Sequence, residues 1–176
     1  MAESLSTSRE SIENTDLVVQ WYCTASAPFS NFYQAGFVFD EKEYPTGEHF
    51  YQSIKHASNP ARAEAIRLAE SIGEAHTLGN LRDDNFDSKV WESLRDDVMF
   101  QGMLAKFQQN EDLGRMLLET GDKMLVQIDS DTHWGMCVVG DGVELHGDNA
   151  AGMVLMRVRE VLRNEAAQAA EAAAPE

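Results

Sequence analysis

The chain has 176 residues, of which 43% are hydrophobic and 25% are charged. This length and balance indicate one domain with a sizeable core, and they exclude two ordinary domains joined by a linker. No apolar run approaches the roughly 20 residues that span a bilayer, so we expect no membrane association and a cytoplasmic location, or a nuclear one in a eukaryote. The formal net charge of −16 argues against a long duplex as a general ligand, although a local site can still hold one or two phosphates.

The first elements in chain order are a leader and two short strands. Residues 1–16 are polar and lack the basic and apolar regions of a signal peptide, so we interpret them as a flexible leader. The run LVVQWY from Leu17 is β-like, and FVFD at 37–40 suggests a second strand that turns back on itself. The two cysteines, Cys23 and Cys137, are more typical of reduced thiols than of a disulfide framework.

A series of helices is predicted next. Thr46 can cap a helix that runs to the break at Asn59 and Pro60, and Pro60 suits the first turn of a second helix that ends near Gly73. A short helical segment is expected at 75–78. The strongest helical pattern begins at the cap Asp87, where apolar residues recur at spacings of three and four.

The last third of the chain predicts a shorter helix from Leu113 to Gly121, a strand with the sequence MLVQI, and a closing helix over 153–162. Residues 164–176 are rich in Ala and Glu, and we interpret them as a flexible tail with a fraying helix end. Helices outnumber the short, scattered strands. The sequence therefore predicts an α-rich α+β fold, a single compact domain over 17–163.

One helix face combines a carboxylate with an amine. Glu48 and Lys55 are seven positions apart, nearly two whole turns, so both project from one face with Gln52 between them. They could share a pocket wall. From the local pattern alone, the alternative is favoured: Glu48 complements the helix dipole and Lys55 is solvated.

A second group of chemical interest lies in the segment DSDTHWG. Asp131 and Trp134 fall in a turn-rich stretch between two strand-like runs, where an aromatic ring could stack on a base beside a carboxylate. The alternative is that Trp134 anchors the core and Asp131 forms the turn. In the same way, Asn31 in FSNF could bond a ligand hydroxyl or belong to a simple turn.

Several familiar site motifs are absent. The five histidines form no HExxH or related metal pattern, and the glycines match neither a dinucleotide fingerprint nor a phosphate loop. There is no GxSxG nucleophile elbow. We therefore assign none of the histidines a metal role.

Four ordered segments resemble the NADAR family: FSNF at 29–32, YPTGEHFYQSIK at 44–55, DTHWG at 131–135 and GDNAAGMVLMRVRE at 147–160. The resemblance extends over most of the chain. It implies a mainly helical domain that cleaves N-glycosides of phosphorylated or ADP-linked ribose without a metal or cofactor. Members remove ADP-ribose from the amino group of modified guanine, or cleave early riboflavin-pathway intermediates.

The resemblance also implies roles for individual residues. The catalytic residues expected are Lys55, Glu48 and Asp131. The residues expected to bind substrate are Asn31, Phe32, Gln52, Arg82, Trp134, Gly135 and Asn149. The chain departs from the family at Gly47, where a Ser is usual, and at Asn80, where an Arg is common, which puts phosphate contacts there in question.

Two mechanisms remain open. An aminal carbon can expel its ring oxygen to form an imine, and a neutral Lys55 can then displace the departing amine while Glu48 shuttles protons. This route requires the pKa of Lys55 to fall well below its usual value. In direct hydrolysis, Glu48 or Asp131 activates water and Lys55 only binds substrate.

The leading prediction is removal of ADP-ribose from guanine bases in nucleic acid or nucleotides. The first alternative is cleavage of phosphoribosylamino-pyrimidine intermediates, and the second is a non-catalytic module that binds ADP-ribose. The expected partners are ADP-ribose or ADP-ribosylated guanine, and the chain is expected to be a monomer.

Overall fold

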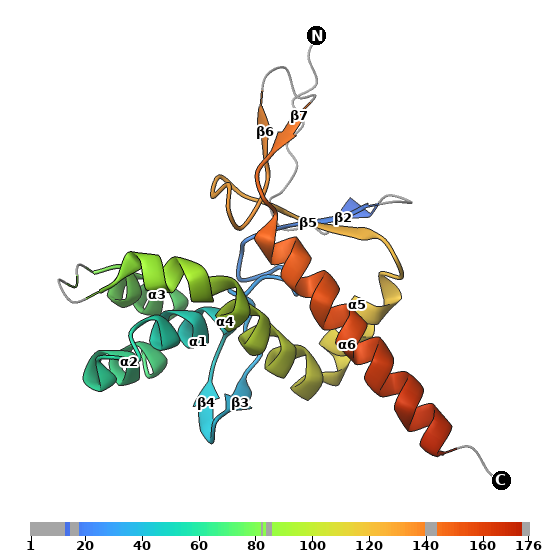
Figure 1. Ribbon diagram of the computed structural model, residues 1–176, viewed down its shortest axis with the longest axis horizontal. Coiled ribbons are helices and arrows are strands. Elements are labelled where there is room, and N and C mark those ends of the chain that lie inside the picture. Colours follow the sequence, from blue (N-terminus) through green and yellow to red (C-terminus); the bar gives the residue numbers. More distant parts are fainter. Residues whose placement is uncertain (1–12, 15–17, 82, 84–85, 140–143, 174–176) are drawn as a thin grey trace.

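The computed structural model describes residues 13–14, 18–81, 83, 86–139 and 144–173 (Figure 1). Within these ranges the helices are α1 (Gly47–Lys55), α2 (Pro60–Arg67), α3 (Ile72–Asn80), α4 (Ser88–Gln109), α5 (Glu111–Glu119) and α6 (Ala150–Ala172). The strands are β1 (Glu13–Asn14), β2 (Val18–Tyr22), β3 (Phe37–Phe39), β4 (Lys42–Tyr44), β5 (Met124–Ile128), β6 (Cys137–Val139) and β7 (Glu144–His146). Helices provide most of the regular structure, which confirms the predicted α-rich α+β class.

Three helices begin at the capping residues that the sequence indicates. The Thr46 hydroxyl accepts the N–H of His49 at 3.3 Å at the start of α1, and the Asn59 side chain caps α2 ahead of Pro60. At the start of α4, Asp87 Oδ1 accepts the backbone N–H groups of Lys89 and Val90. Each cap satisfies donors that the first helical turn would otherwise leave without a partner.

Two helices are longer than the sequence predicts. α3 begins at Ile72 rather than Ala75, because the Ser71 hydroxyl caps the helix by accepting the N–H of Glu74. α6 extends to Ala172 rather than ending at Leu162, since alanine has the highest helix propensity and the helix does not need packing there to persist. The closing helix is therefore longer than predicted, and the flexibility of the tail stays a prediction.

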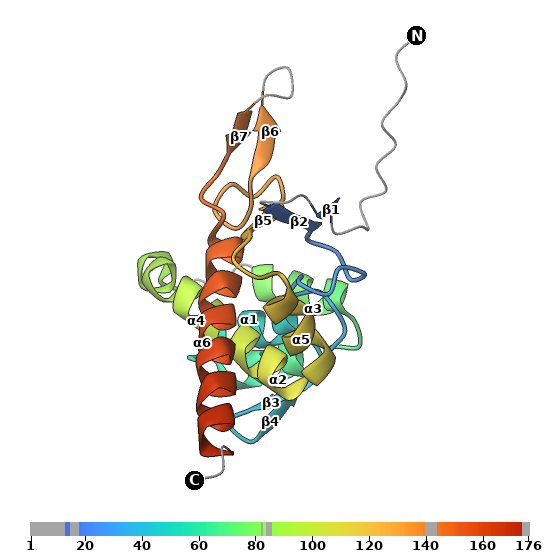
Figure 2. The same cartoon turned by 90° about the vertical axis from the view of Figure 1, so that its right-hand side faces the viewer.

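A small sheet brings distant segments together. β2 pairs with β1 in antiparallel fashion and with β5 in parallel, with Tyr22 opposite Ile128 (Figure 2). Because β2 and β5 are parallel, their carboxyl ends meet at one edge of the sheet. The loops over 23–32 and 129–135 therefore leave the sheet side by side. α6 begins beside β5, so the elements that will form a cavity meet at this edge.

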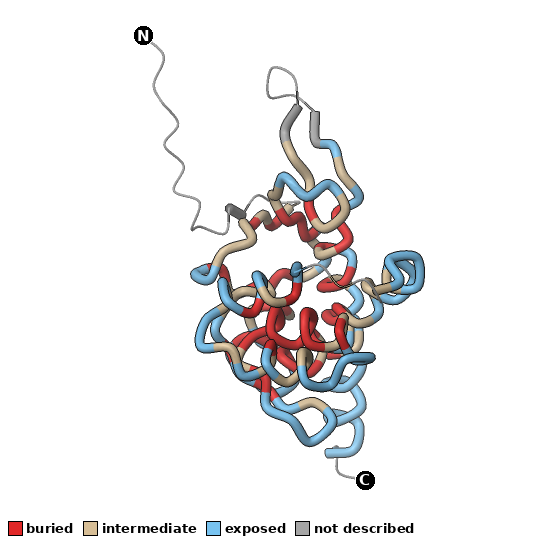
Figure 3. Tube along the Cα trace, turned by 90° about the vertical axis from the view of Figure 1, so that its left-hand side faces the viewer, coloured by how far each residue is buried: buried red, intermediate tan, exposed pale blue. Residues whose placement is uncertain are grey.

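The core lies between this sheet and the helices, where Figure 3 shows the buried part of the trace. Trp21 of β2 meets Phe29 edge-on at 5.9 Å between ring centroids, and Phe29 lies 6.1 Å from Phe107 of α4. Lys106 is fully buried, and its Nζ donates to the carbonyl oxygens of Pro28 at 3.2 Å and Ser30 at 2.8 Å. These bonds fix the loop after β2 to α4.

The division of the chain into leader, domain and tail stays a prediction. Most of the leader lies outside the described residues, of which only Glu13 and Asn14 belong to it. In the part of the chain that the structure covers, no helix is both long and apolar enough to cross a membrane. Cys23 and Cys137 are both free thiols.

Candidate active site

A cavity of about 400 Å³ opens between the helices and the two loops at the carboxyl edge of the sheet. Its lining combines acids, cations, amides and aromatic rings: Cys23, Phe29, Asn31, Phe32, Glu48, Tyr51, Gln52, Lys55, His76, Asn80, Trp91, Arg95, Met99, Met103, Gln127, Asp129, Asp131, Trp134, Ala151, Val154 and Leu155. The volume lies in the range of small-molecule sites. Seven of the ten predicted site residues line this cavity: Asn31, Phe32, Glu48, Gln52, Lys55, Asp131 and Trp134.

Glu48 is buried, with 3% of its surface exposed, and it is held by three donors. Its Oε1 accepts from Gln52 Nε2 at 2.9 Å and from His76 Nδ1 at 2.8 Å, and its Oε2 accepts from Asn31 Nδ2 at 2.7 Å. The backbone N–H of Glu48 also donates to the Asn31 carbonyl. Asn31 and Gln52 thus hold the carboxylate in one orientation within the cavity.

Lys55 lies on the same face of α1, one helical turn beyond Gln52. Its Nζ donates to Asn80 Oδ1 at 2.9 Å and lies 5.5 Å from the centroid of the Phe86 ring. Burial lowers the pKa of Lys55, and the charge of Arg62 lowers it further, against the opposing effect of Glu48. The environment therefore shifts this amine toward the neutral form that a nucleophile needs.

Aromatic side chains form one wall. The Trp134 ring meets Tyr51 edge-on, with centroids 5.5 Å apart, and Tyr51 lies 5.0 Å from Trp91. Phe32 lines the cavity as well and contacts the His76 ring at 6.1 Å. Flat faces of this kind can stack on a base or a ribose.

Asp131 both forms a turn and lines the cavity, so the two interpretations of its sequence are compatible. Its Oδ1 accepts the backbone N–H groups of His133 at 3.0 Å and Trp134 at 3.2 Å. The preceding carboxylate, Asp129, accepts the N–H of Asp131 and also lines the cavity. These bonds hold the backbone at Asp131, His133 and Trp134 in a turn beside the cavity.

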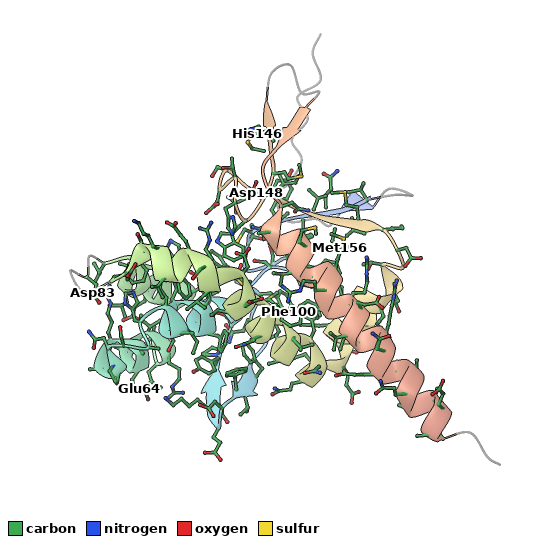
Figure 4. The ribbon with its side chains drawn as sticks, in the orientation of Figure 1. Glu64, Asp83, Phe100, His146, Asp148 and Met156 are labelled. Atoms are coloured by element: carbon green, nitrogen blue, oxygen red, sulfur yellow. The ribbon has the colours of Figure 1, made fainter. Side chains whose placement is uncertain are left out.

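The turn is tied to the rest of the molecule through His133. Its Nε2 lies 2.8 Å from Asp96 Oδ1 of α4, and its Nδ1 lies 3.4 Å from Asp148 Oδ2. Figure 4 shows Asp148 between the β6–β7 hairpin and the start of α6. The aromatic wall is therefore anchored to α4 and to the segment before α6.

Two predicted substrate-binding residues do not line the cavity. Asn149 is buried, and its side chain donates to the Leu125 carbonyl at 2.8 Å and accepts the Gln127 N–H at 3.0 Å. A Cβ at Gly135 would lie 2.6 Å from Asp129 Cβ and 2.9 Å from the Gln127 carbonyl. The structure gives both residues a scaffolding role, because they let α6 and the 129–135 loop approach β5. Arg82 lies outside the described residues.

Several lining residues were missed by the sequence analysis. The sequence analysis gave His76 no role, although its spacing of four from Asn80 places both residues on one face of a helix. Arg95 lines the cavity, and its buried Nε has no hydrogen-bond partner. Cys23 also lies here, where burial raises the pKa of the thiol to about 12 and makes it a poor nucleophile. No local motif marks Arg95 or Cys23.

Among the described residues, no three His, Cys, Asp or Glu side chains are grouped as metal ligands. The cavity instead offers an amine, carboxylates held by amides, and aromatic faces. These groups can bind a sugar joined to a base, transfer protons and form a covalent bond to a carbonyl-type carbon.

Comparison with known proteins gives consistent results. The family model of the NADAR domain matches residues 19–163. The N-glycosidase YbiA of Escherichia coli K12 is 35% identical over 153 residues, which cover 85% of this chain and 91% of that protein. A riboflavin biosynthesis protein of maize, PYRR, is 36% identical over 137 residues, 73% of this chain but 21% of that protein.

The fold agrees with that of a solved relative. The NMR structure of E. coli YbiA superposes with a TM-score of 0.73 and 32% sequence identity, covering 88% of this chain and 89% of that chain. The family model covers most of the chain, and the YbiA relative matches along nearly its whole length. This chain belongs to the NADAR family and is similar to hydrolases that act on N-glycosyl bonds.

Proposed function

We propose that this N-glycosidase-like protein hydrolyses the bond between ribose and an exocyclic nitrogen, and that its substrate is ADP-ribosylated guanine in a nucleotide or nucleic acid. One observation carries the proposal: Glu48, Lys55, Asp131 and Trp134 line the same cavity. Its volume of about 400 Å³ suits a ribose with part of a base or phosphate group. The names of the YbiA relatives support the reaction type.

The proposed reaction uses Lys55 as the nucleophile. Proton transfer to the ring oxygen opens the ribose, which leaves an imine between the anomeric carbon and the exocyclic nitrogen. The neutral Nζ of Lys55 adds to this carbon, the base departs as an amine, and water then releases the sugar from the lysine imine. Glu48, fixed by Asn31 and Gln52, moves the protons.

Arg95 is the cation proposed to face the phosphate groups. Its guanidinium lines the cavity, and its buried Nε lies 3.9 Å from Asp96 Oδ1 without a hydrogen bond. A buried N–H donor without a partner is costly, so an anionic oxygen placed there would be stabilised. The predicted role of Arg82 in substrate binding stays a prediction, since Arg82 lies outside the described residues.

The direct test supplies two substrates to the purified protein. A guanine oligonucleotide carrying ADP-ribose should yield unmodified oligonucleotide and free ADP-ribose, as measured by mass spectrometry. A phosphoribosylamino-pyrimidine should react more slowly. An unchanged oligonucleotide together with rapid cleavage of the pyrimidine compound would transfer the proposal to the second substrate.

The pyrimidine compound is the second candidate because of one finding. The maize relative is named a riboflavin biosynthesis protein and is 36% identical over 137 residues. A third outcome, tight binding of ADP-ribose with neither substrate cleaved, would identify the chain as a binding module and reject the enzymatic proposal.

A further inference from the structure

Four polar side chains form a hydrogen-bonded chain along the mouth of the cavity. Glu48 Oε1 lies 2.8 Å from His76 Nδ1, His76 Nε2 lies 3.1 Å from Asn80 Nδ2, and Asn80 Oδ1 accepts from Lys55 Nζ at 2.9 Å. Its ends are the carboxylate and the amine of the proposed reaction. His76 and Asn80 are neighbours on α3, and the His76 side chain is 54% exposed.

The donors and acceptors along this chain define one protonation state. A carboxylate only accepts, so His76 donates from Nδ1 to Glu48, and its Nε2 then accepts the N–H of Asn80. The Asn80 amide group also donates to the His76 carbonyl at 2.9 Å, which turns its oxygen toward Lys55. In this resting state His76 is neutral and Lys55 is an ammonium.

Protonation of His76 reverses the pattern. An imidazolium donates from both nitrogens, so Nε2 can no longer accept from Asn80, and the amide must turn over to present its oxygen. The turned amide directs an N–H at Lys55 Nζ. An ammonium has no lone pair to accept it, whereas a neutral amine does.

We propose that Asn80 makes His76 and Lys55 share one proton, so that His76 is a positioning residue that takes up the proton when Lys55 acts as a neutral amine. Lys55 Nζ loses a proton and keeps the electron pair, and the lone pair of His76 Nε2 gains a proton from solvent. The net charge of the pair is unchanged. This inference rests on the proposed function for its purpose, but its chemistry requires no substrate.

The surroundings bring the two proton affinities closer together. The hydrogen bond to Glu48 raises the pKa of His76, against burial and the charge of Lys55. Burial and the charge of Arg62 on α2 lower the pKa of Lys55, against Glu48. Among the described residues, two uncharged rings also contact the pair: Phe32 lies 6.1 Å from the His76 ring, and the Phe86 centroid lies 5.5 Å from Lys55 Nζ.

The first test measures the His76 titration by NMR in the full chain without substrate. Lys55→Met should raise the pKa of His76 by about one unit, the shift expected from one hydrogen bond to a charged group. In the Asn80→Ala background the same Lys55→Met substitution should shift it by clearly less. An equal shift in both backgrounds would mean that charge repulsion alone links the two groups and would overturn the proposal.

The second test measures Lys55 itself, by its rate of acetylation with trace acetic anhydride at neutral pH and peptide mass spectrometry. His76→Gln should slow acetylation by up to about tenfold, the factor that corresponds to one pKa unit. Asn80→Asp should slow it as well, because a carboxylate accepts from both cations at once and removes the competition. Thr77→Ala, an exposed change on the same helix, is the control and should leave the rate unchanged.

These outcomes are separate from those of the function assay. Coupled titrations with no cleavage of any substrate would retain the shared proton and reject the proposed function. Cleavage with unaltered Lys55 reactivity in both His76→Gln and Asn80→Asp would retain the function and reject the shared proton.

Discussion

Lys55 is the residue on which the proposed chemistry depends most, because its amine must be both close to the substrate and neutral. A cavity position, a lowered pKa and a hydrogen bond to an amide oxygen meet at this side chain. The hydrogen bond favours the ammonium, whereas burial favours the neutral amine. The amine is therefore placed between two states rather than fixed in one.

Replacing Lys55 separates the two mechanisms. Lys55→Arg keeps a positive charge that can bind phosphate but cannot form an imine, because guanidinium stays protonated. We expect turnover to fall roughly 10³-fold or more, as for the loss of other catalytic nucleophiles. Borohydride added during turnover should trap sugar on Lys55 in the unmodified protein. Activity retained in Lys55→Arg, with no trapped adduct, would favour direct hydrolysis.

Lys106, which does not line the cavity, predicts a pH dependence of stability. Burial lowers the pKa of Lys106 to about 7, below its value in the unfolded chain. The unfolded chain therefore binds more protons than the folded one above pH 7, so stability should rise with pH, by at most about 1.4 kcal/mol per unit. Urea unfolding between about pH 7 and pH 8.5 measures this. Above about pH 8 the Cys23 thiol opposes this rise, because burial raises its pKa to about 12 whereas a thiol in the unfolded chain ionises at about pH 8.5.

The variant Lys106→Met is the comparison for that measurement. Its apolar side chain fills similar space but leaves the carbonyl oxygens of Pro28 and Ser30 without a donor. We expect a flatter pH profile together with a lower stability at pH 8.5. The same slope in both proteins would show that other groups cause the pH dependence.

At the scale of elements, the 129–135 loop shows how one side chain can serve both structure and chemistry. Asp131→Asn keeps the oxygen that accepts the N–H groups of His133 and Trp134 but removes the charge, whereas Asp131→Ala removes both. The alanine variant should lose about 0.5–2 kcal/mol of stability, like the loss of a helix cap. Both variants should lose activity if the charge takes part in the reaction. Full activity in Asp131→Asn would show that Asp131 only stabilises the turn and takes no part in the reaction.

The end of α6 is an element with little to hold it. Residues 164–173 are exposed, and Glu165 makes one exposed hydrogen bond, to Gln108. The free energy of unfolding of a chain ending at Asn164 should therefore lie within about 0.5 kcal/mol of that of the full protein, and the shortened chain should keep its activity. Thermal unfolding and the cleavage assay check this. A larger loss would show that this segment belongs to the folded domain.

Local signals predicted most of the helices because their caps and spacings are contained in short stretches of sequence. Thr46 and Asp87 mark helix starts in this way. The candidate site could not be predicted from local signals, because the pairing of β2 with β5 joins segments that no local pattern connects. The scaffolding role of Asn149 and the place of Arg95 in the cavity follow from this pairing and from α4 packing, so sequence alone could not show them.

At the scale of the whole molecule, the charge of −16 shapes how an anionic substrate approaches. Most nucleic-acid-binding proteins lose affinity as salt rises, because their cations release counterions. Here the long-range field repels the substrate, and salt screens that repulsion. We expect KM for an ADP-ribosylated oligonucleotide to stay level or fall between roughly 50 and 200 mM salt. A steep increase of KM with salt would indicate an extended basic binding surface.

The parallel pairing of β2 and β5 also bears on biosynthesis. A ribosome releases the amino-terminal part of a chain first, so β2 emerges long before the segment over 124–128 that pairs with it. Until then the wall that carries Asp131 and Trp134 does not exist. A nascent or prematurely terminated polypeptide thus holds Glu48 and Lys55 without the opposite wall of the cavity, so the proposed activity can begin only when translation is nearly complete.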